Sequence, residues 1–358
     1  MTVLWLTLVS VFFLALSARY FSTPSVAIPY SVKPNLLLAL FVGICLILVG
    51  GLQKNIGDTP FYMHSFAITD FQMAIYQNKQ KDIGFNLLQL LLKMMTNDPQ
   101  ILIFVVAFVT NALIVIGFYK YSRLFELSVF VYITSGAFIV SMNGIRQYLV
   151  AAILFAATKY ILDGSWKKYI AVVLVASFFH QSALIMIPIY FLVRKKAWTG
   201  TTYLLLSAAV LIVFAFNEFS SVLFSALKDT NYSEYQNISE GGANVIRAVV
   251  FAAPLLFAYI GREKLRALFP KIDIFVNLSI LGVVVMIIST QNWIFARIAI
   301  YFNQYLFVLI AWIVMVFREK DRKLIYLLIM MLYLAFFFYE AVVSLGVTYR
   351  SDYITWFS

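Results

Sequence analysis

The sequence is poor in charged residues, histidine and cysteine, and each shortage excludes a class of protein. Charged side chains make up 12% of the 358 residues, about half of the share typical of a soluble domain. Cys45 is the one cysteine, so no intrachain disulfide can form. His64, His180 and Cys45 show no metal-ligand spacing, and no Walker, dinucleotide-binding or GxSxG motif is present.

Hydrophobic residues dominate instead, at 63% of the chain. A bilayer leaves only helices and closed barrels able to satisfy the backbone, and the apolar runs here are continuous rather than alternating. The sequence therefore predicts an all-α polytopic membrane protein, with a first helix that is retained because Arg19 follows its apolar run instead of preceding it. About 10 transmembrane helices are expected, at 2–18, 35–50, 100–118, 125–141, 146–162, 201–217, 245–260, 274–289, 299–317 and 324–340.

We expect residues 1–358 to form a single integral membrane domain with two polar extracytoplasmic loops. The first loop, 51–99, ends in "IGFNLLQLLLKMM", which is typical of an amphipathic helix lying at the membrane interface. The second loop, 218–243, is rich in acidic residues.

The run 169–193 is the ambiguous part of the topology, because it is long enough to cross once but has a polar centre. If the run is a re-entrant hairpin, about two-thirds of all Lys and Arg residues lie on the cytoplasmic side. If it crosses once, fewer than half do. The positive-inside rule therefore favours the hairpin. The arms 169–179 and 182–193 are each too short to span. The alternative is one ordinary span with a buried histidine. The hairpin places both chain termini outside the cytoplasm.

In this topology several arginines begin spans or follow them at the outer face, against the positive-inside trend. Arginine suits phosphate because its planar fork donates two parallel hydrogen bonds, so a polyanionic ligand is expected, although each arginine alone also fits a snorkelling anchor. Tyr301 lies one turn beyond Arg297 and is a candidate for orienting that arginine. The arginines concerned are Arg146, Arg247, Arg297 and Arg350.

Two residues are candidates for a catalytic base. His180 forms the hairpin apex with Gln181 and Ser182, and a histidine in a wet cavity can accept a proton near neutral pH. Asp58 follows Gly57 in the first polar loop and is the second candidate, for the base or for orienting a sugar hydroxyl. The alternative is that Gly57 is present simply to permit a turn.

Several motifs, in order and spacing, resemble those of the EpsG family of Wzy-like exopolysaccharide polymerases. The most specific are Asn143–Gln147 and Phe179–Ala183. The matching stretches are "GLQKNIGDTPFY", "FELSVFVY", "MNGIRQYLVAAILF", "FFHQSALIMIPIYFLV", "NVIRAVV", "FARIAIYF" and the terminal "YR". Many relatives have "GLR" followed by "GTD", where this chain has Gly51-Leu52-Gln53 and Gly57-Asp58-Thr59, so an arginine is missing and the aspartate is shifted by one.

The resemblance implies a multi-pass protein of the bacterial plasma membrane, distantly GT-C-like, that joins polyprenyl-diphosphate-linked oligosaccharides at the outer face. It adds Asn143 and Gln147 to the substrate-binding candidates. Membrane lipids and other exopolysaccharide-synthesis proteins are the further partners expected, and nucleic acid is not. No cofactor or resident metal is expected, although a divalent cation on the diphosphate remains open. The alternative functions are a flippase for the same lipid-linked units and a membrane acyltransferase using His180.

Overall fold

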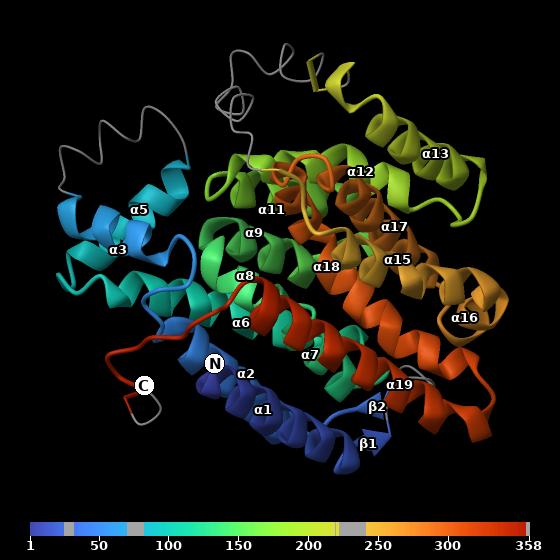
Figure 1. Ribbon diagram of the computed structural model, residues 1–358, viewed down its shortest axis with the longest axis horizontal. Coiled ribbons are helices and arrows are strands. Elements are labelled where there is room, and N and C mark those ends of the chain that lie inside the picture. The colour runs from blue at the N-terminus through green and yellow to red at the C-terminus, as the bar shows by residue number, and fades with distance from the viewer. Residues whose placement is uncertain (25–31, 70–81, 219, 222–240, 356–358) are drawn as a thin grey trace. The chain divides into compact units, whose positions relative to one another are not determined.

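The computed structural model describes residues 1–24, 32–69, 82–218, 220–221 and 241–355, which are largely helical (Figure 1). It divides into two compact units. The first contains residues 1–190 and 310–358, and the second contains residues 191–309. The described β structure is one antiparallel pair, β1 (Thr23–Pro24) with β2 (Val32–Lys33).

The first unit carries most of the helices. In chain order they are α1 (Thr2–Tyr20), α2 (Leu36–Gly51), α3 (Thr59–Ile68), α5 (Ile83–Lys93), α6 (Gln100–Tyr121), α7 (Phe125–Thr134), α8 (Ala137–Asn143), α9 (Ile145–Ala156), α10 (Thr158–Leu162), α11 (Trp166–Ser177), the 3₁₀ helix η1 (Gln181–Ile185), η3 (Val314–Val316), α19 (Glu319–Phe337) and the π-helical η4 (Phe338–Ser344). α12 (Met186–Val193) passes from this unit into the second.

The second unit is built around α17, which packs against α13 and α15. Its helices are α13 (Gly200–Phe214), α15 (Val245–Ile260), α16 (Arg262–Leu268), α17 (Ile272–Ser289) and α18 (Ile294–Ile313), whose end reaches into the first unit. Most of the predicted loop 218–243 lies outside the described residues.

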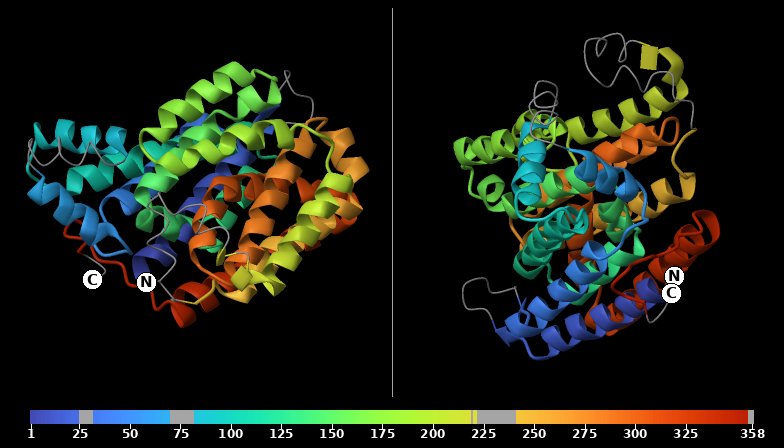
Figure 2. Two further views of the ribbon diagram at one scale, coloured as in Figure 1. Left: turned by 90° about the horizontal axis from the view of Figure 1, so that it is seen from above. Right: turned by 90° about the vertical axis from the view of Figure 1, so that its left-hand side faces the viewer.

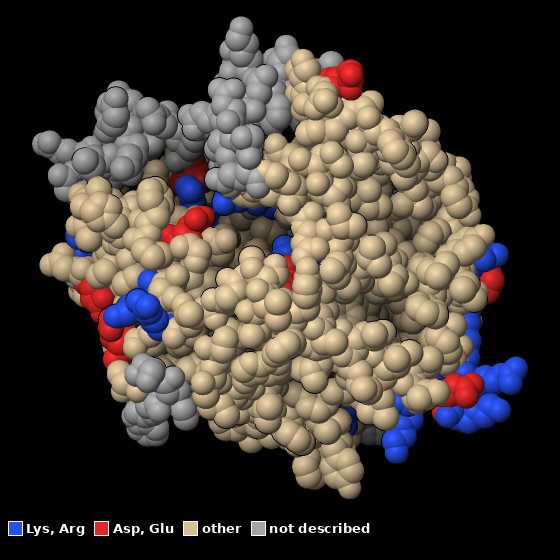
Figure 3. All heavy atoms as spheres, in the orientation of Figure 1, with Lys and Arg blue, Asp and Glu red and all other residues tan. Residues whose placement is uncertain are grey.

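The helical, polytopic character is confirmed, but ten full-length spans are not. Among the described residues, five helices are long and apolar enough to cross a membrane, or up to seven if two bent pairs each count as one span. The predicted spans 35–50, 146–162 and 201–217 correspond to the shorter helices α2, α9 with α10, and α13. Figure 3 shows one face of the molecule, on which uncharged residues predominate and charged side chains occur in small groups.

The predicted span 125–141 is broken in the structure, and a glycine explains the break. α7 and α8 meet at a bend of 58°. Gly136 lies between them with φ of 79°, a left-handed conformation that residues with a Cβ rarely adopt. Every residue of α7 is buried, so this helix lies inside the unit, between α1, α6 and α19.

The run 169–193 folds back on itself. α11 ends at Ser177, and the chain resumes as η1 and α12 after His180. The rings of Tyr169 and Tyr190 stack with their centroids 5.4 Å apart, whereas a continuous helix would separate these residues by about 30 Å. The two arms therefore form an antiparallel hairpin with His180 near its apex, as the sequence predicts. Its depth in a membrane remains a prediction.

The amphipathic helix predicted at the end of the 51–99 loop is α5. It lies beside α3 (Figure 2, cyan and blue) and buries Phe85 and Leu92 in a cluster with Tyr62 and Phe66 of α3 and residues of α6 and α9. Lys93 donates to the carbonyls at the end of α3. This packing fixes the start of α5 against the start of α9.

Candidate functional site

Arg146 is held at the start of α9, over two aromatic rings. α8 ends at Asn143, and the next helix begins at Ile145, so Arg146 lies in the first turn. Its guanidinium carbon lies 5.4 Å from the ring centre of Tyr62 and 5.7 Å from that of Phe85. Nε also donates to the Tyr62 hydroxyl at 3.3 Å. A cation at a helix N-terminus is unfavourable because the dipole is positive there, which favours a nearby anion.

That anion is Asp82, directly before α5. Its Oδ2 accepts from Arg146 Nη1 at 2.9 Å and lies 3.3 Å from His180 Nδ1. Its Oδ1 accepts from the Gln181 backbone N–H at 3.2 Å. The residue has φ of 49° and ψ of 44°, a left-handed conformation that is tolerated more readily by aspartate than by most residues. One carboxylate therefore joins α5, α9 and the hairpin apex.

The hairpin apex is also fixed through the backbone. Gly84 donates its N–H to the Phe178 carbonyl at 2.8 Å. A Cβ at this position would lie 3.1 Å from three atoms of Phe178, so glycine permits the close approach. α5 thus docks onto the turn that carries His180.

The geometry gives His180 a defined tautomer. An ionised carboxylate only accepts hydrogen bonds, so the contact with Asp82 assigns the proton of a neutral imidazole to Nδ1 and leaves Nε2 as the acceptor. The Asp82 side chain is 8% exposed, whereas His180 is 23% and Arg146 34% exposed. The carboxylate is therefore covered, while the imidazole and guanidinium remain accessible. This arrangement can take a proton and bind an anion side by side.

Asp58 lies elsewhere in the first unit, directly before α3. Its backbone N–H donates to Asn143 Oδ1 at 2.8 Å. Gly57 has φ of 55°, and a Cβ there would overlap the Asn143 side chain. Both a turn and a close approach thus require glycine at this position. Of the two candidates for the base, Asp58 thus lies next to Asn143, whereas His180 lies next to Asp82.

Gln53 organises the loop between α2 and α3. The side chain is fully buried and donates to Thr59 Oγ1 at 2.6 Å. Its carbonyl oxygen accepts from the N–H groups of Asn55 and Ile56. The neutral Gln53 side chain therefore closes the loop between α2 and α3 through hydrogen bonds.

Arg350 lies in the C-terminal tail, which runs along that loop. Its carbonyl accepts from Lys54 N at 3.0 Å, and its N–H donates to Asn55 Oδ1 at 2.7 Å. Asp352 forms an ion pair with Lys54. The tail and loop are thereby joined, with the Arg350 side chain exposed. Gln147, by contrast, is buried in α9.

The remaining candidates belong to the second unit. The Arg297 guanidinium lies 5.1 Å from the Trp293 ring centre, Tyr301 is buried one turn further along α18, and Arg247 lies in the first turn of α15.

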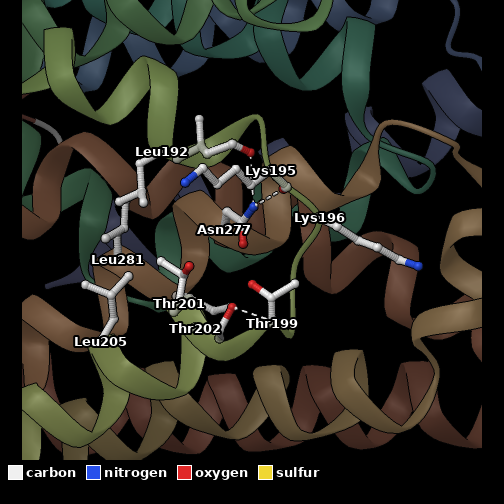
Figure 4. A pocket seen from close by; sticks show the side chains of 11 residues that line it. Leu192, Lys195, Lys196, Thr199, Thr201, Thr202, Leu205, Asn277 and Leu281 are labelled. Atoms are coloured by element: carbon white, nitrogen blue, oxygen red, sulfur yellow. Dashed lines mark hydrogen bonds between the residues drawn. The ribbon is translucent and has the colours of Figure 1, made fainter.

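A separate small pocket in the second unit, about 20 Å³ in volume, has room for about one water. There Asn277 donates to the Val193 and Lys195 carbonyls (Figure 4).

Neither Asp82 nor Tyr62 is among the site residues predicted from the sequence. Asp82 directly precedes an amphipathic segment, the position of an acidic helix cap, and this was the available signal. Its two side-chain partners, Arg146 and His180, lie 64 and 98 residues away in sequence, so the network itself has no local pattern. Among the described residues no group of three His, Cys, Asp or Glu side chains could hold a metal ion.

Comparison with known proteins identifies the family. The model of the EpsG family matches residues 36–354. No curated protein and no solved structure matches the chain. The matched range includes Asp82, Arg146 and His180 as well as both units, and it covers nearly the whole chain. The protein therefore belongs to the EpsG family, a family of Wzy-like polymerases.

Proposed function

We propose that this protein joins polyprenyl-diphosphate-linked oligosaccharide units into an exopolysaccharide at the outer face of the bacterial plasma membrane. Membership of the EpsG family supports a polymerase-type membrane protein of exopolysaccharide biosynthesis. The observation that carries the proposal is the convergence of Arg146 and His180 on Asp82. A candidate proton acceptor and a candidate phosphate-binding cation thus share one hydrogen-bonded network.

In the proposed reaction His180 is the general base. The acceptor hydroxyl oxygen bonds to the anomeric carbon of the donor sugar, while the bond from that carbon to the diphosphate oxygen breaks. The hydroxyl proton passes to Nε2 of His180, and the electron pair of the broken bond leaves with the diphosphate. Asp82 orients the ring through Nδ1 and stabilises the imidazolium that forms. Asp58 is the second candidate for the base.

Arg146 is the proposed first contact of the diphosphate. Charge grows on the leaving diphosphate in the transition state, and a guanidinium placed at that charge lowers the barrier. The rings of Tyr62 and Phe85 hold the guanidinium from the side of the protein. Asn143 and Arg350, which lie in the same unit as Arg146, are proposed as further substrate-binding residues. Gln147, Arg247, Arg297 and Tyr301 stay predictions from the sequence.

The site is proposed to face the outside through the re-entrant hairpin 169–193. A polar apex at membrane depth requires surrounding protein or water, and the contacts of Gln181 and Phe178 with residues 82–84 provide the protein side of such a cavity. In this orientation both termini are extracytoplasmic.

Reconstitution in liposomes with lipid-linked repeat units tests the function. We expect wild-type protein to produce long glycans, and His180→Ala and Arg146→Ala to lose about 100-fold or more in rate. His64→Ala, which replaces the other histidine, is the matched control and should retain activity. Wild-type rates in both site variants would refute the assignment. Transfer of the lipid-linked units across the membrane without polymerisation would favour a flippase, and acylation of the repeat would favour an acyltransferase.

A further inference from the structure

A second charged cluster lies in the first unit, at the opposite end of α6 from the His180 site. Arg146 follows Ile145, which packs against Leu102 and Ile103 near the start of α6. Arg123 lies just beyond the end of this 22-residue helix, so the two arginines are separated by about 30 Å, the thickness of the hydrocarbon core. The proposed chemistry does not use this cluster.

Two helices and one connector bring arginines together there. Arg19 lies in the last turn of α1, Arg123 in the connector between α6 and α7, and Arg322 in the first turn of α19. α7 packs against both α1 and α19. Glu126, in the first turn of α7, is fully buried and forms an ion pair with Arg19.

The cluster has more positive than negative charge. Glu126 already pairs with Arg19. Within the described part of the chain, the ion-pair partner of Arg322 is Glu319, an 89% exposed side chain 3.5 Å away, which is a weak surface pair. Among the described residues Arg123 makes no ion pair. Burial and the neighbouring Arg19 and Arg322 guanidiniums lower the pKa of Arg123. The positive-inside rule accounts for basic residues at this end, but not for guanidiniums gathered around a half-buried position.

We propose that Arg123, with Arg19 and Arg322 beside it, binds the phosphate of an anionic phospholipid headgroup. Arginine forks match phosphate oxygens in geometry and charge, and basic pockets between membrane helices are known to bind acidic headgroups. Apolar side chains exposed beside the arginines provide the second requirement, contact with acyl chains. Leu16, one turn before Arg19 on α1, is such a side chain. The exposed Leu324 and Leu328 extend the apolar surface along another face of α19. A free phosphate ion would not use them.

Native mass spectrometry of the full-length protein tests the proposal. The probes are phosphatidylglycerol, phosphatidylcholine and inorganic phosphate, added separately to detergent-solubilised protein. We expect wild-type protein to retain phosphatidylglycerol in preference to phosphatidylcholine. Arg123→Gln should weaken this binding about fivefold, and Arg123→Lys should weaken it less. Lys120→Gln, an exposed lysine in the last turn of α6, removes the same charge nearby and should leave binding unchanged.

Two results would overturn the proposal. One is undiminished phosphatidylglycerol binding in both Arg123→Gln and Arg322→Gln, which would show that the headgroup binds elsewhere. The other is inorganic phosphate displacing the bound lipid without loss of stability, which would identify the site as one for soluble phosphate. Arg322→Gln also keeps the test informative if Arg123→Gln does not fold.

Discussion

His180 Nδ1 lies 3.3 Å from Asp82 Oδ2, although 98 residues separate them in the sequence. This contact joins the turn of the 169–193 hairpin to the residue before α5. Because Arg146 binds the same carboxylate oxygen, the orientation of the proposed base and the position of the proposed phosphate ligand depend on one side chain. Removing its charge should therefore impair both functions together.

Asp82→Asn is expected to lower the polymerisation rate about 10- to 100-fold, the effect of losing a hydrogen bond to a charged group. The amide can donate to Nδ1, which favours the wrong tautomer of His180, and it no longer neutralises Arg146. The measurement is the initial rate with lipid-linked repeats at several pH values, together with the Michaelis constant for the donor.

Asp98→Asn is the matched control for Asp82→Asn, because it removes an exposed carboxylate from the same polar segment. It should leave the rate within about twofold of wild type, as surface charges contribute little. Equal rates for Asp82→Asn and wild type across the pH range would exclude a role for Asp82 in positioning His180.

Gly84→Ala should separate α5 from the hairpin apex. The new methyl group would lie 3.1 Å from two backbone atoms and the Cβ atom of Phe178, and overpacking of this kind costs about 1–3 kcal/mol. We expect a lower unfolding temperature, measured by intrinsic fluorescence in detergent, and a lower polymerisation rate because Asp82 moves with Gly84. Gly200→Ala, which adds a methyl group into open space, is the control. Indistinguishable stability of the two variants would contradict the docking.

Gly57→Ala tests the corner formed by Asp58 and Asn143. The positive φ alone costs a residue with a Cβ about 1–2 kcal/mol. Gly346→Ala measures that cost separately, because Gly346 has a similar φ of 53° with open space around it. Since Gly57→Ala also overlaps Asn143, it should destabilise the protein more, and the excess should shrink when Asn143→Ala is added. Equal destabilisation of the two glycine variants would show that the close approach to Asn143 is absent.

Local sequence patterns predicted the parts of the fold that depend on local composition. The apolar runs gave most helix positions, and the polar residues from His180 to Ser182 correctly marked a break. The left-handed Gly136 and the resulting bend were not predicted. Ser135-Gly136 is a dipeptide that marks turns, but the long apolar run around it favoured one continuous span. Of the candidate site, Arg146 and His180 were identified from chemistry. The position of Asp82 before α5 marks it only as a helix-cap candidate, and its contacts with Arg146 and His180 depend on tertiary packing that no local pattern encodes.

The orientation of the hairpin in the membrane is the last prediction. In a Cys45→Ala background, Gly200→Cys should be labelled only from the cytoplasmic side and Lys228→Cys only from outside, by a maleimide that does not cross membranes. Gly200 begins α13, and a side chain there meets no neighbouring atom within 4 Å, so the cysteine should be tolerated; Lys228 lies outside the described residues. A single crossing of 169–193 would reverse both results. It would also place the two ends of the fold-back on opposite sides, which the stacking of Tyr169 on Tyr190 opposes.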